Sequence, residues 1–256
     1  MRKIISTLLA LLAVLAVGAG MTVVALTNGT PVAKDGSVSA FDRIGRAFTA
    51  AEVAARDRRY AANASSGRGE PDAVHWVDRT DSSPLVIVAP HAVNHHRDGE
   101  PKPADRYTGP IAEILARRLG ASVLTTTGEV SDWNEQWDDR DDEFTRILHD
   151  LPDEAIIIDL HGMADSSAAE PISLGTGKKD SGPSMEIAEG IKDSFGGAAE
   201  INETFTAKAA YTDTRHMQGR GHDALQVEMA QSMRNPGDLN VGYTIDALEG
   251  ALESLH

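Results

Sequence analysis

The sequence contains no cysteine, and this absence removes two ways of cross-linking a chain. Disulfide bonds cannot form, and structural zinc sites built from thiolates are excluded as well. A metal ion bound to this chain would have to be held by histidine, aspartate or glutamate side chains. The 9 histidines and 39 acidic residues supply such ligands in number.

Basic residues are scarce relative to acidic ones, with 24 lysines and arginines, a formal net charge of -15 and a pI near 4.9. Nucleic-acid binding requires clustered basic side chains that neutralise phosphates, so nucleic acid is excluded as an expected partner. The remaining composition, 41% hydrophobic and 25% charged, is typical of a globular protein. A chain of 256 residues is long enough for one substantial domain.

The amino terminus has the pattern of an export segment. Arg2 and Lys3 precede an apolar run over residues 4–26, an arrangement that places the rest of the chain outside the cytoplasm. Val17, Gly18 and Ala19 form an acceptable cleavage site, but the run also has the roughly 20 residues that cross a bilayer. We therefore expect a signal peptide or signal anchor over residues 1–26, a linker over 27–38, and a secreted or membrane-anchored domain over 39–256.

Beyond the linker, strand-like and helix-like segments alternate. Residues 39–60 fit an amphipathic helix, with Phe41, Ile44, Phe48 and Ala51 on one stripe. Strands are predicted over residues 73–77, 85–89, 122–126, 155–160, 172–174 and 224–229, and further helices over 108–119, 143–149, 184–195 and 241–255. The strands "PLVIVAP" and "AIIIDL" are continuously apolar, which is typical of strands covered on both faces. The sequence predicts a single α/β domain with a mainly parallel or mixed central sheet flanked by helices.

Two of these strands end in histidine, since "LVIVAPH" leads to His91 and "AIIIDLHG" to His161. Ligands of open α/β sheets collect at the carboxyl ends of the strands. Glu228 lies in the apolar run "DALQVEMA", where an ionisable group is costly unless it is paired or used. One strand-end histidine is more often structural, but two with a buried glutamate favour a zinc site with an open fourth position.

The third ligand is open on spacing alone. The candidates are Asp98, Glu100, Asp105, His95 and His96. Asp105 lies three residues before Thr108, where the helical pattern begins, and a carboxylate in a first helical turn gains about 0.3–1 kcal/mol from the helix dipole. The same spacing is also explained if Asp105 is an ordinary acidic residue at the start of a helix, with no metal bound.

Three segments, "VAPHAVNHHRDGEPKPADRYTGPIAEILARRLGA", "IIIDLHGM" and "ALQVEMA", together resemble the N-formylglutamate amidohydrolase family. Its kin are the poly-γ-glutamate hydrolases and, more distantly, the zinc carboxypeptidases. The resemblance spans roughly residues 85–234 and implies a zinc-carboxypeptidase-like (phosphorylase/hydrolase-like) fold. It also implies a zinc-dependent amidohydrolase that binds one Zn²⁺.

The resemblance assigns roles to individual residues. It implies that His91, Asp105 and His161 hold the metal and that Glu228 is the general base. Asp105, Thr108 and Ala112 reproduce the spacing of the poly-γ-glutamate hydrolases, although aspartate replaces their glutamate and the loop after His91 is longer. The His-x-x-Glu pair of the carboxypeptidases is absent, because the second position is Asn94. His96 is the first alternative to Asp105 as third ligand.

The expected substrate is a small or peptide-like molecule with a free carboxylate, such as an acylated or γ-linked glutamate. Arg215 is a candidate clamp for that carboxylate, although an ordinary basic loop is the alternative. Asn134 and Arg140 are further candidates to face the substrate. Asp159 is expected on the opposite face of the sheet from His161, as a structural partner.

Other functions are compatible with the same sequence. One is a non-catalytic envelope protein that uses the cleft only to bind a carboxylate-bearing ligand. Another is an exported metallohydrolase that acts on esters or phosphoesters. The membrane is a partner only if the amino-terminal segment is not cleaved.

Overall fold

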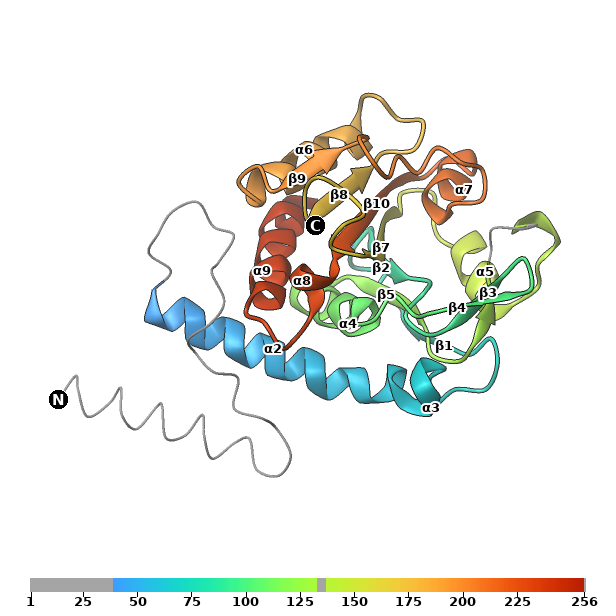
Figure 1. Cartoon of the computed structure of the whole chain (residues 1–256). Helices are drawn as coiled ribbons and strands as arrows, with labels where there is room; N and C mark the ends of the chain where they lie inside the picture. The colour runs from blue at the N-terminus through green and yellow to red at the C-terminus, as the bar shows by residue number, and fades with distance from the viewer. Residues whose placement is uncertain (1–38, 133–136, 256) are drawn as a thin grey trace.

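The computed structural model describes residues 39–132 and 137–255 (Figure 1). The segments expected as export signal and linker, residues 1–26 and 27–38, lie outside the described residues, and so does Asn134. Among the described residues, no helix has both the length and the apolarity to cross a bilayer.

The core of the fold is a seven-stranded sheet in the order β1-β5-β2-β7-β10-β8-β9. Strands β5, β2, β7 and β10 are parallel to one another, whereas β1 runs antiparallel to β5 and β8 antiparallel to β10. The sheet is therefore mixed, with a parallel centre. Its strands are β1 (Val74–Val77), β2 (Leu85–Ala89), β5 (Ser122–Thr126), β7 (Ile156–Met163), β8 (Ile172–Gly175), β9 (Ala199–Ile201) and β10 (Asp223–Ala230).

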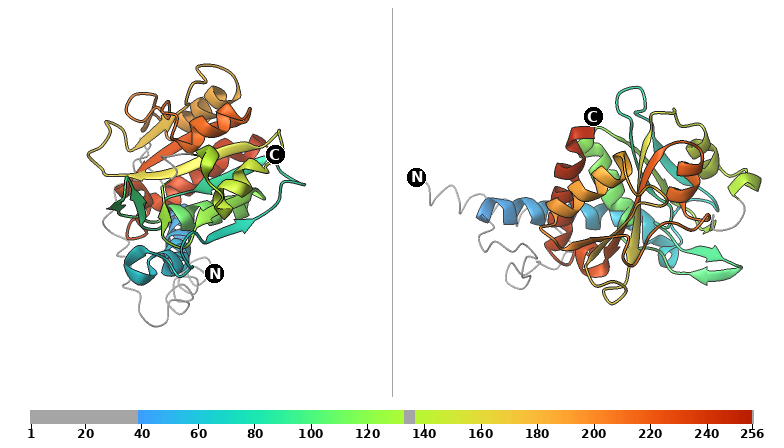
Figure 2. Two further views of the ribbon diagram at one scale, coloured as in Figure 1. Left: turned by 90° about the vertical axis from the view of Figure 1, so that its right-hand side faces the viewer. Right: turned by 90° about the horizontal axis from the view of Figure 1, so that it is seen from above.

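Helices cover both faces of this sheet (Figure 2). Leu85, Ile87 and Ala89 of β2 belong to one buried cluster, and Val86 and Val88 belong to the other. This division explains why the strand is continuously apolar, since successive side chains of a strand point to opposite faces. The first face packs against α2 (Ala40–Tyr60), α4 (Thr108–Leu119), α6 (Pro183–Ser194) and α9 (Asn240–Leu252), and the second against α5 (Glu143–His149) and α7 (Asp213–Gly219).

The predicted α/β class and all six predicted strands are confirmed, as are the five predicted helices. The elements that the sequence analysis did not predict are short: α3 (Ala62–Ser65), β3 (His95–Arg97), β4 (Glu100–Lys102), β6 (Val130–Ser131), η1 (Trp137–Asp139), β9, α7, α8 (Gln231–Arg234) and η2 (Glu253–Leu255).

Strands β4, β3 and β6 form a second, three-stranded sheet in the order β4-β3-β6. β3 and β4 are joined through Asp98 and Gly99, whose φ angles of 55° and 75° are both positive. Positive φ at both central residues is the requirement of a type I′ hairpin turn, and Asp-Gly satisfies it readily. The segment after His91 is therefore an ordered hairpin and not only a polar loop.

The apolar stripe predicted for the first helix is not the face that α2 buries. Phe41, Ile44 and Phe48 are 80%, 38% and 53% exposed. The helix instead buries Thr49, Ala50, Val53, Asp57 and Tyr60 against its neighbours. The helix itself is confirmed, and its apolar stripe faces outward.

Candidate metal centre

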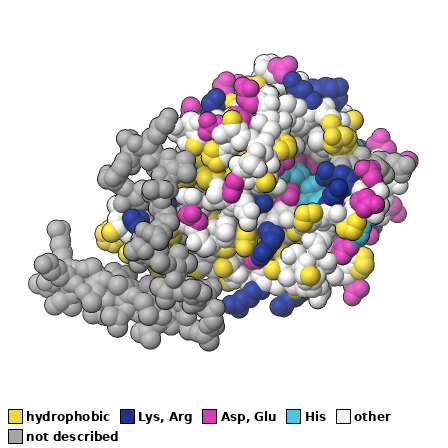
Figure 3. Space-filling view, in the orientation of Figure 1, with side chains coloured by type: hydrophobic (Ala, Val, Ile, Leu, Met, Phe, Trp, Pro, Cys, Tyr) yellow, Lys and Arg dark blue, Asp and Glu magenta, His cyan; other side chains and the backbone are white. Residues whose placement is uncertain are grey.

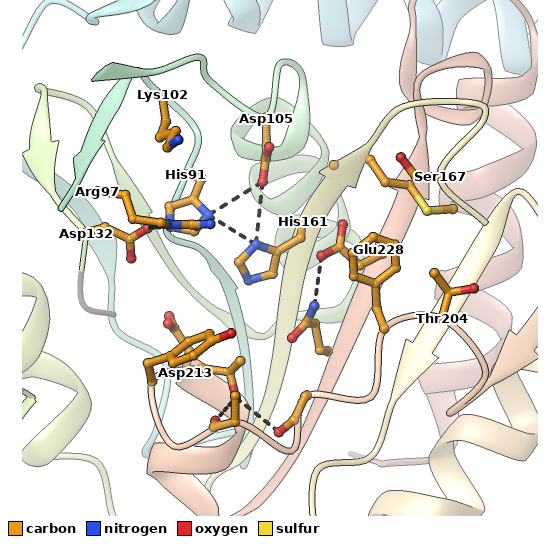
Figure 4. Close-up of a pocket in the computed structure, with 18 of the residues that line it drawn as sticks. His91, Arg97, Lys102, Asp105, Asp132, His161, Ser167, Thr204, Asp213 and Glu228 are labelled. Carbon is orange, nitrogen blue, oxygen red and sulfur yellow. Dashed lines mark hydrogen bonds and ion pairs between the residues drawn. The ribbon is translucent and has the colours of Figure 1, made fainter. Parts of the chain in front are cut away.

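The carboxyl ends of β2 and β7 bring the two predicted strand-end histidines together (Figure 4). His91 lies two residues after the end of β2, and His161 lies in β7. In the parallel pairing of β7 with β10, His161 is the register partner of Glu228. Because they are register partners, the side chains of His161 and Glu228 lie on the same face of the sheet. Both of them line one pocket together with His91.

Asp105 completes a group of three possible metal ligands with the two histidines. The distance between His91 Nδ1 and His161 Nδ1 is 3.2 Å, and Asp105 Oδ2 lies 3.6 Å from His91 Nδ1 and 3.5 Å from His161 Nδ1. A tetrahedral zinc ion with bonds of about 2.0–2.2 Å separates its ligand atoms by about 3.3–3.6 Å. The three donor atoms therefore fit a shared cation, and three protein ligands leave a fourth position open.

A tight turn positions Asp105. Its backbone N–H donates to the carbonyl of His91 at 2.8 Å, and its own carbonyl accepts from the N–H and hydroxyl of Thr108 at 3.2 and 2.8 Å. Tyr107 has φ 76° and ψ -7°, the values of the third residue of a type II turn. Tyr107 is also the N-cap of α4, so Asp105 lies before the helix and not in its first turn.

Two buried carboxylates lie behind the histidines. Asp159 Oδ1 is 2.8 Å from His161 Nε2, and Asp132 Oδ2 is 3.4 Å from His91 Nε2. A carboxylate on the second ring nitrogen orients an imidazole and keeps its metal-binding nitrogen basic. The expectation that Asp159 points to the opposite face was wrong, because residues two apart on a strand share a face. Its expected role as a partner of His161 agrees with the contact.

The two histidines of the loop after His91 occupy different environments. His95 is buried and stacks on His91 with ring centroids 4.1 Å apart, and its Nε2 lies 3.7 Å from Asp132 Oδ2. His91, His95 and Asp132 form a second group with suitable donor spacing. His96 is more exposed and pairs with Glu129 at 3.2 Å. The structure thus brings His95, and not His96, next to the first group.

Charge in the site is strongly polarised. Burial alone would lower the pKa of His91, but the carboxylates of Asp105 and Asp132 outweigh it and raise this pKa to about 9. The pKa of His161 is also raised well above its usual value, since Asp159 and Asp105 offset its burial. Burial opposes ionisation of Asp105, yet its contacts with both histidines hold the pKa of this carboxyl well below its usual range. The pocket is therefore built to hold positive charge.

Glu228 lies beside His161, on the side of the pocket away from His91 (Figure 4). It is only 8% exposed, and burial raises its pKa to about 7. Gln226, on the same face of β10, donates a hydrogen bond from Nε2 to Glu228 Oε1 at 2.8 Å. The carboxyl group is thereby held in place with its second oxygen available to the pocket, and it exchanges protons near neutral pH.

These groups line a cavity of about 550 Å³. One wall comes from the β3–β4 hairpin and carries Arg97 and Lys102, and another comes from the segment before α7 and carries Lys208. In the space-filling view, histidine lies in a hollow with basic side chains beside it (Figure 3). A molecule that enters the cavity meets the candidate metal ligands at the floor and cations on the walls.

Of the predicted substrate-binding residues, Asn134 lies outside the described residues, and neither Arg215 nor Arg140 lines this cavity. Arg215 lies on α7 and does not line it. Arg140 pairs with Asp142 at 2.6 Å and donates to the backbone carbonyl of Asp132 at 3.2 Å, so it supports the pocket from behind. A role for Arg215 or Arg140 in substrate binding stays a prediction.

Sequence reasoning missed several residues of the cavity. Lys102, Asp132 and Lys208 lie in or next to short strands and loops, where no hydrophobic pattern marks them. Asp213, the first residue of α7, also lines the cavity, and burial followed by the nearby Asp159 raises its pKa well above the usual value. Only the Asp-Gly turn of the β3–β4 hairpin was a usable signal, since it brings Lys102 back toward the site.

Comparison with known proteins gives no match to a family model or to a curated protein. Similar solved structures include a gene product of Agrobacterium tumefaciens (14% identity, TM-score 0.47, covering 73% of this chain and 96% of that one). Another is an N-formylglutamate amidohydrolase from Ralstonia eutropha JMP134 (14% identity, TM-score 0.46, 71% and 98%). A metallo-carboxypeptidase from Burkholderia cenocepacia also matches (12% identity, TM-score 0.44, 71% and 59%).

Two of the three kinds of protein named in the sequence resemblance, the N-formylglutamate amidohydrolases and the carboxypeptidases, are thus among the structures similar to this chain. At these identities and TM-scores the likeness carries no argument about activity.

Proposed function

We propose that this protein is an extracytoplasmic zinc-dependent amidohydrolase that cleaves an amide bond in a carboxylate-bearing substrate. The observation that carries the proposal is the joint geometry of one pocket. His91, Asp105 and His161 offer three donor atoms within 3.2–3.6 Å of one another, and Glu228 lies beside them as a buried carboxyl. Two histidines and a carboxylate with an open fourth position are typical of catalytic zinc sites.

When bound, zinc supplies a water molecule acidified to a pKa of about 7 and a Lewis acid for the scissile carbonyl. Glu228 takes the proton from the attacking water and returns it to the leaving amine. Its pKa of about 7 suits both steps, since a carboxyl near neutrality accepts and donates a proton with little cost. Gln226 keeps one carboxylate oxygen occupied, and Asp132 and Asp159 hold the two imidazoles in place.

The walls of the pocket support an anionic substrate. Lys102 lies on the wall from the β3–β4 hairpin and Lys208 on the wall before α7, while Arg97 is paired with Asp132. Two lysines on the walls of one cavity, in a chain of net charge -15, favour a ligand with carboxylates. An acylated or γ-linked glutamate has a carboxylate beside the scissile amide and satisfies this requirement.

The location of the protein is proposed from the sequence. Arg2 and Lys3, followed by the apolar residues 4–26, favour export, with the domain secreted or held at the membrane. An enzyme placed there would act on envelope or external amides.

Replacing Glu228 by Gln tests the proposal, because the change keeps the shape of the side chain and removes the base. We expect the variant to keep its zinc while amide hydrolysis falls about 10²–10⁴-fold. Glu129→Gln is the matched control, since Glu129 lies outside the cavity and pairs with His96. Zinc is measured by elemental analysis, and hydrolysis on N-acyl and γ-linked glutamates.

Three outcomes would contradict parts of the proposal. If the wild-type protein binds no zinc, both the proposed metal centre and the proposed mechanism are wrong. If it binds zinc but hydrolyses no amide, ester or phosphoester, a binding protein that uses the same cleft is favoured. If it hydrolyses only esters or phosphoesters, the metal centre is correct and the proposed amide substrate is wrong.

A further inference from the structure

Exposed apolar side chains gather at the amino-terminal end of α2. Phe41, Ile44 and Phe48 are 80%, 38% and 53% exposed, and Tyr211 is the one other exposed large hydrophobic residue in the described part of the chain. The three side chains are spaced by three and four residues, so they form one stripe along the helix. Single exposed hydrophobic residues are ordinary, whereas an aligned group indicates a contact surface.

This stripe, Phe41, Ile44 and Phe48, faces away from the protein core. At 3.6 residues per turn, it points roughly 150° from the direction of the buried residues Thr49, Ala50 and Val53. The helix is well formed here, since the hydroxyl of Ser39 accepts from the N–H of Asp42 at 3.2 Å and the Asp42 carboxylate accepts from Ser39 in return. The stripe is therefore a regular helix face that no described residue of the chain covers.

Charge does not explain the stripe. Asp42 and Arg43 offset each other, and Arg46 lies over the ring of Tyr243 and 3.6 Å from Asp246. No cationic patch accompanies the apolar side chains among the described residues of α2, and the whole chain carries a net charge of -15. A partner that recognises this surface must do so through apolar contact.

The position of the stripe along the chain points to the partner. The apolar residues 4–26 are long enough to cross a bilayer, and the polar residues 27–38 connect them to Ser39. A segment of this length can span roughly 40 Å at most, whatever its conformation. With residues 4–26 in a membrane, the start of α2 would be held close to the membrane surface, where even weak apolar contacts become effective.

We propose that Phe41, Ile44 and Phe48 insert into the interfacial region of the lipid bilayer that holds residues 4–26. Helices of this kind lie on a membrane with their apolar side chains buried to a depth of about 5–10 Å. α2 is then a second membrane contact that fixes the orientation of the catalytic domain. The proposal rests on the predicted anchor and is independent of the proposed chemistry.

The absence of cysteine makes a direct test possible. Single substitutions Phe41→Cys and Phe48→Cys in the full chain are labelled with a polarity-sensitive nitrobenzoxadiazole dye and reconstituted into phosphatidylcholine vesicles. We expect dye emission to shift to shorter wavelength and to be quenched by spin-labelled phosphatidylcholine, with no dependence on sodium chloride. Asp141→Cys is the control, since its side chain is 93% exposed and it precedes α5, on the other side of the molecule (Figure 1).

Each other outcome would overturn the proposal. Dyes at positions 41 and 48 that behave like the control in vesicle-bound protein would show that the stripe stays in water. A shift without quenching by spin-labelled lipid would show that protein covers it, either residues 1–38 or a second copy of the chain. If the full-length protein does not float with the vesicles, residues 4–26 do not anchor it, and the premise of the proposal is wrong. Unchanged far-ultraviolet circular dichroism confirms that each labelled variant is folded.

Discussion

Gln226 and Glu228 lie two residues apart on β10, and the Gln226 amide donates a hydrogen bond to the Glu228 carboxyl group. This hydrogen bond affects how readily Glu228 takes up a proton. The bond favours the ionised carboxylate, so its removal raises the pKa of Glu228 above its present value of about 7. Because the general base must be deprotonated, we expect Gln226→Leu to move the acid limb of kcat/KM to higher pH. Activity should fall more at pH 6 than at pH 9.

Gln231→Leu is the matched control, since Gln231 is exposed at the start of α8 and does not line the cavity. The pH profile of kcat/KM is the measurement. An acid limb that stays in place in Gln226→Leu would show that Gln226 does not act through Glu228.

His91 makes metal binding depend on pH. Its pKa of about 9 means that it carries a proton at pH 7, and this proton must leave before the ring nitrogen binds a metal. We therefore expect zinc affinity to rise as the pH increases toward 9 and protons to be released on binding at pH 7. Calorimetric titration in two buffers of different ionisation enthalpy measures the release, and equal heats in both buffers would contradict it.

At the scale of residues, the sequence predicted the floor of the pocket better than its walls. His91, His161 and Glu228 are predicted because each lies in or shortly after a strong apolar strand, whereas Asp105 is singled out by the family resemblance, since its spacing left the third ligand open. Lys102, Asp132 and Lys208 come from segments whose positions depend on tertiary packing, and no periodicity marks them.

Helices α2 and α4 are joined by a buried polar contact. The hydroxyl of Tyr60 donates to Glu113 of α4 and lies 2.8 Å from Thr125 Oγ1, while the ring is 1% exposed. Removing the hydroxyl leaves a buried carboxylate with one donor fewer, which costs about 1–3 kcal/mol. We expect Tyr60→Phe to lower the free energy of unfolding by that amount in urea denaturation.

Tyr211→Phe is the control for this change, because Tyr211 is 51% exposed. It should alter the free energy of unfolding by less than about 0.5 kcal/mol, as surface changes usually do. Equal stabilities of the two variants would show that the Tyr60 hydroxyl does not stabilise the packing of α2 on α4.

At the scale of elements, the sequence predicts the long apolar helices and strands correctly but does not predict the short polar ones. The predicted bounds of β2, β5, α4 and α5 agree with those in the structure. β3, β4 and β6 have two or three residues each and are held by one another, so their hydrophobic pattern is too short to interpret. The outward stripe of α2 shows that an amphipathic pattern locates a helix without telling which face is buried.

At the scale of the whole molecule, the candidate metal ligands join segments that are distant in the sequence. His91 follows β2, Asp105 precedes α4, and His161 lies in the central strand β7. An ion that binds only the folded chain stabilises it by about 2.7 kcal/mol when its concentration is 100 times Kd. We expect zinc to raise Tm and a chelator to reverse the rise.

His161→Ala should abolish the dependence of Tm on zinc, whereas His96→Ala should keep it, since His96 pairs with Glu129 outside the ligand group. Thermal unfolding followed by circular dichroism with and without zinc measures both variants. A Tm that does not respond to zinc in the wild type would contradict the metal centre.

The fold class was predictable because the continuously apolar strands and the intervening helices together require a sheet covered on both faces. The antiparallel direction of β1 and β8 was not predictable, since direction depends on how connections cross the sheet and not on local pattern. The walls of the cavity were not predictable for the same reason, because they are formed by connections between strands.

The two outermost strands of the large sheet, β1 with 4 residues and β9 with 3, are among its shortest. An edge strand offers unpaired backbone groups to other chains, and a short edge offers few of them. The long apolar strands β7 and β10 lie inside the sheet, where both of their sides are already paired. The fold therefore keeps its longest apolar strands away from the edges of the sheet, where a strand of another molecule could pair with them.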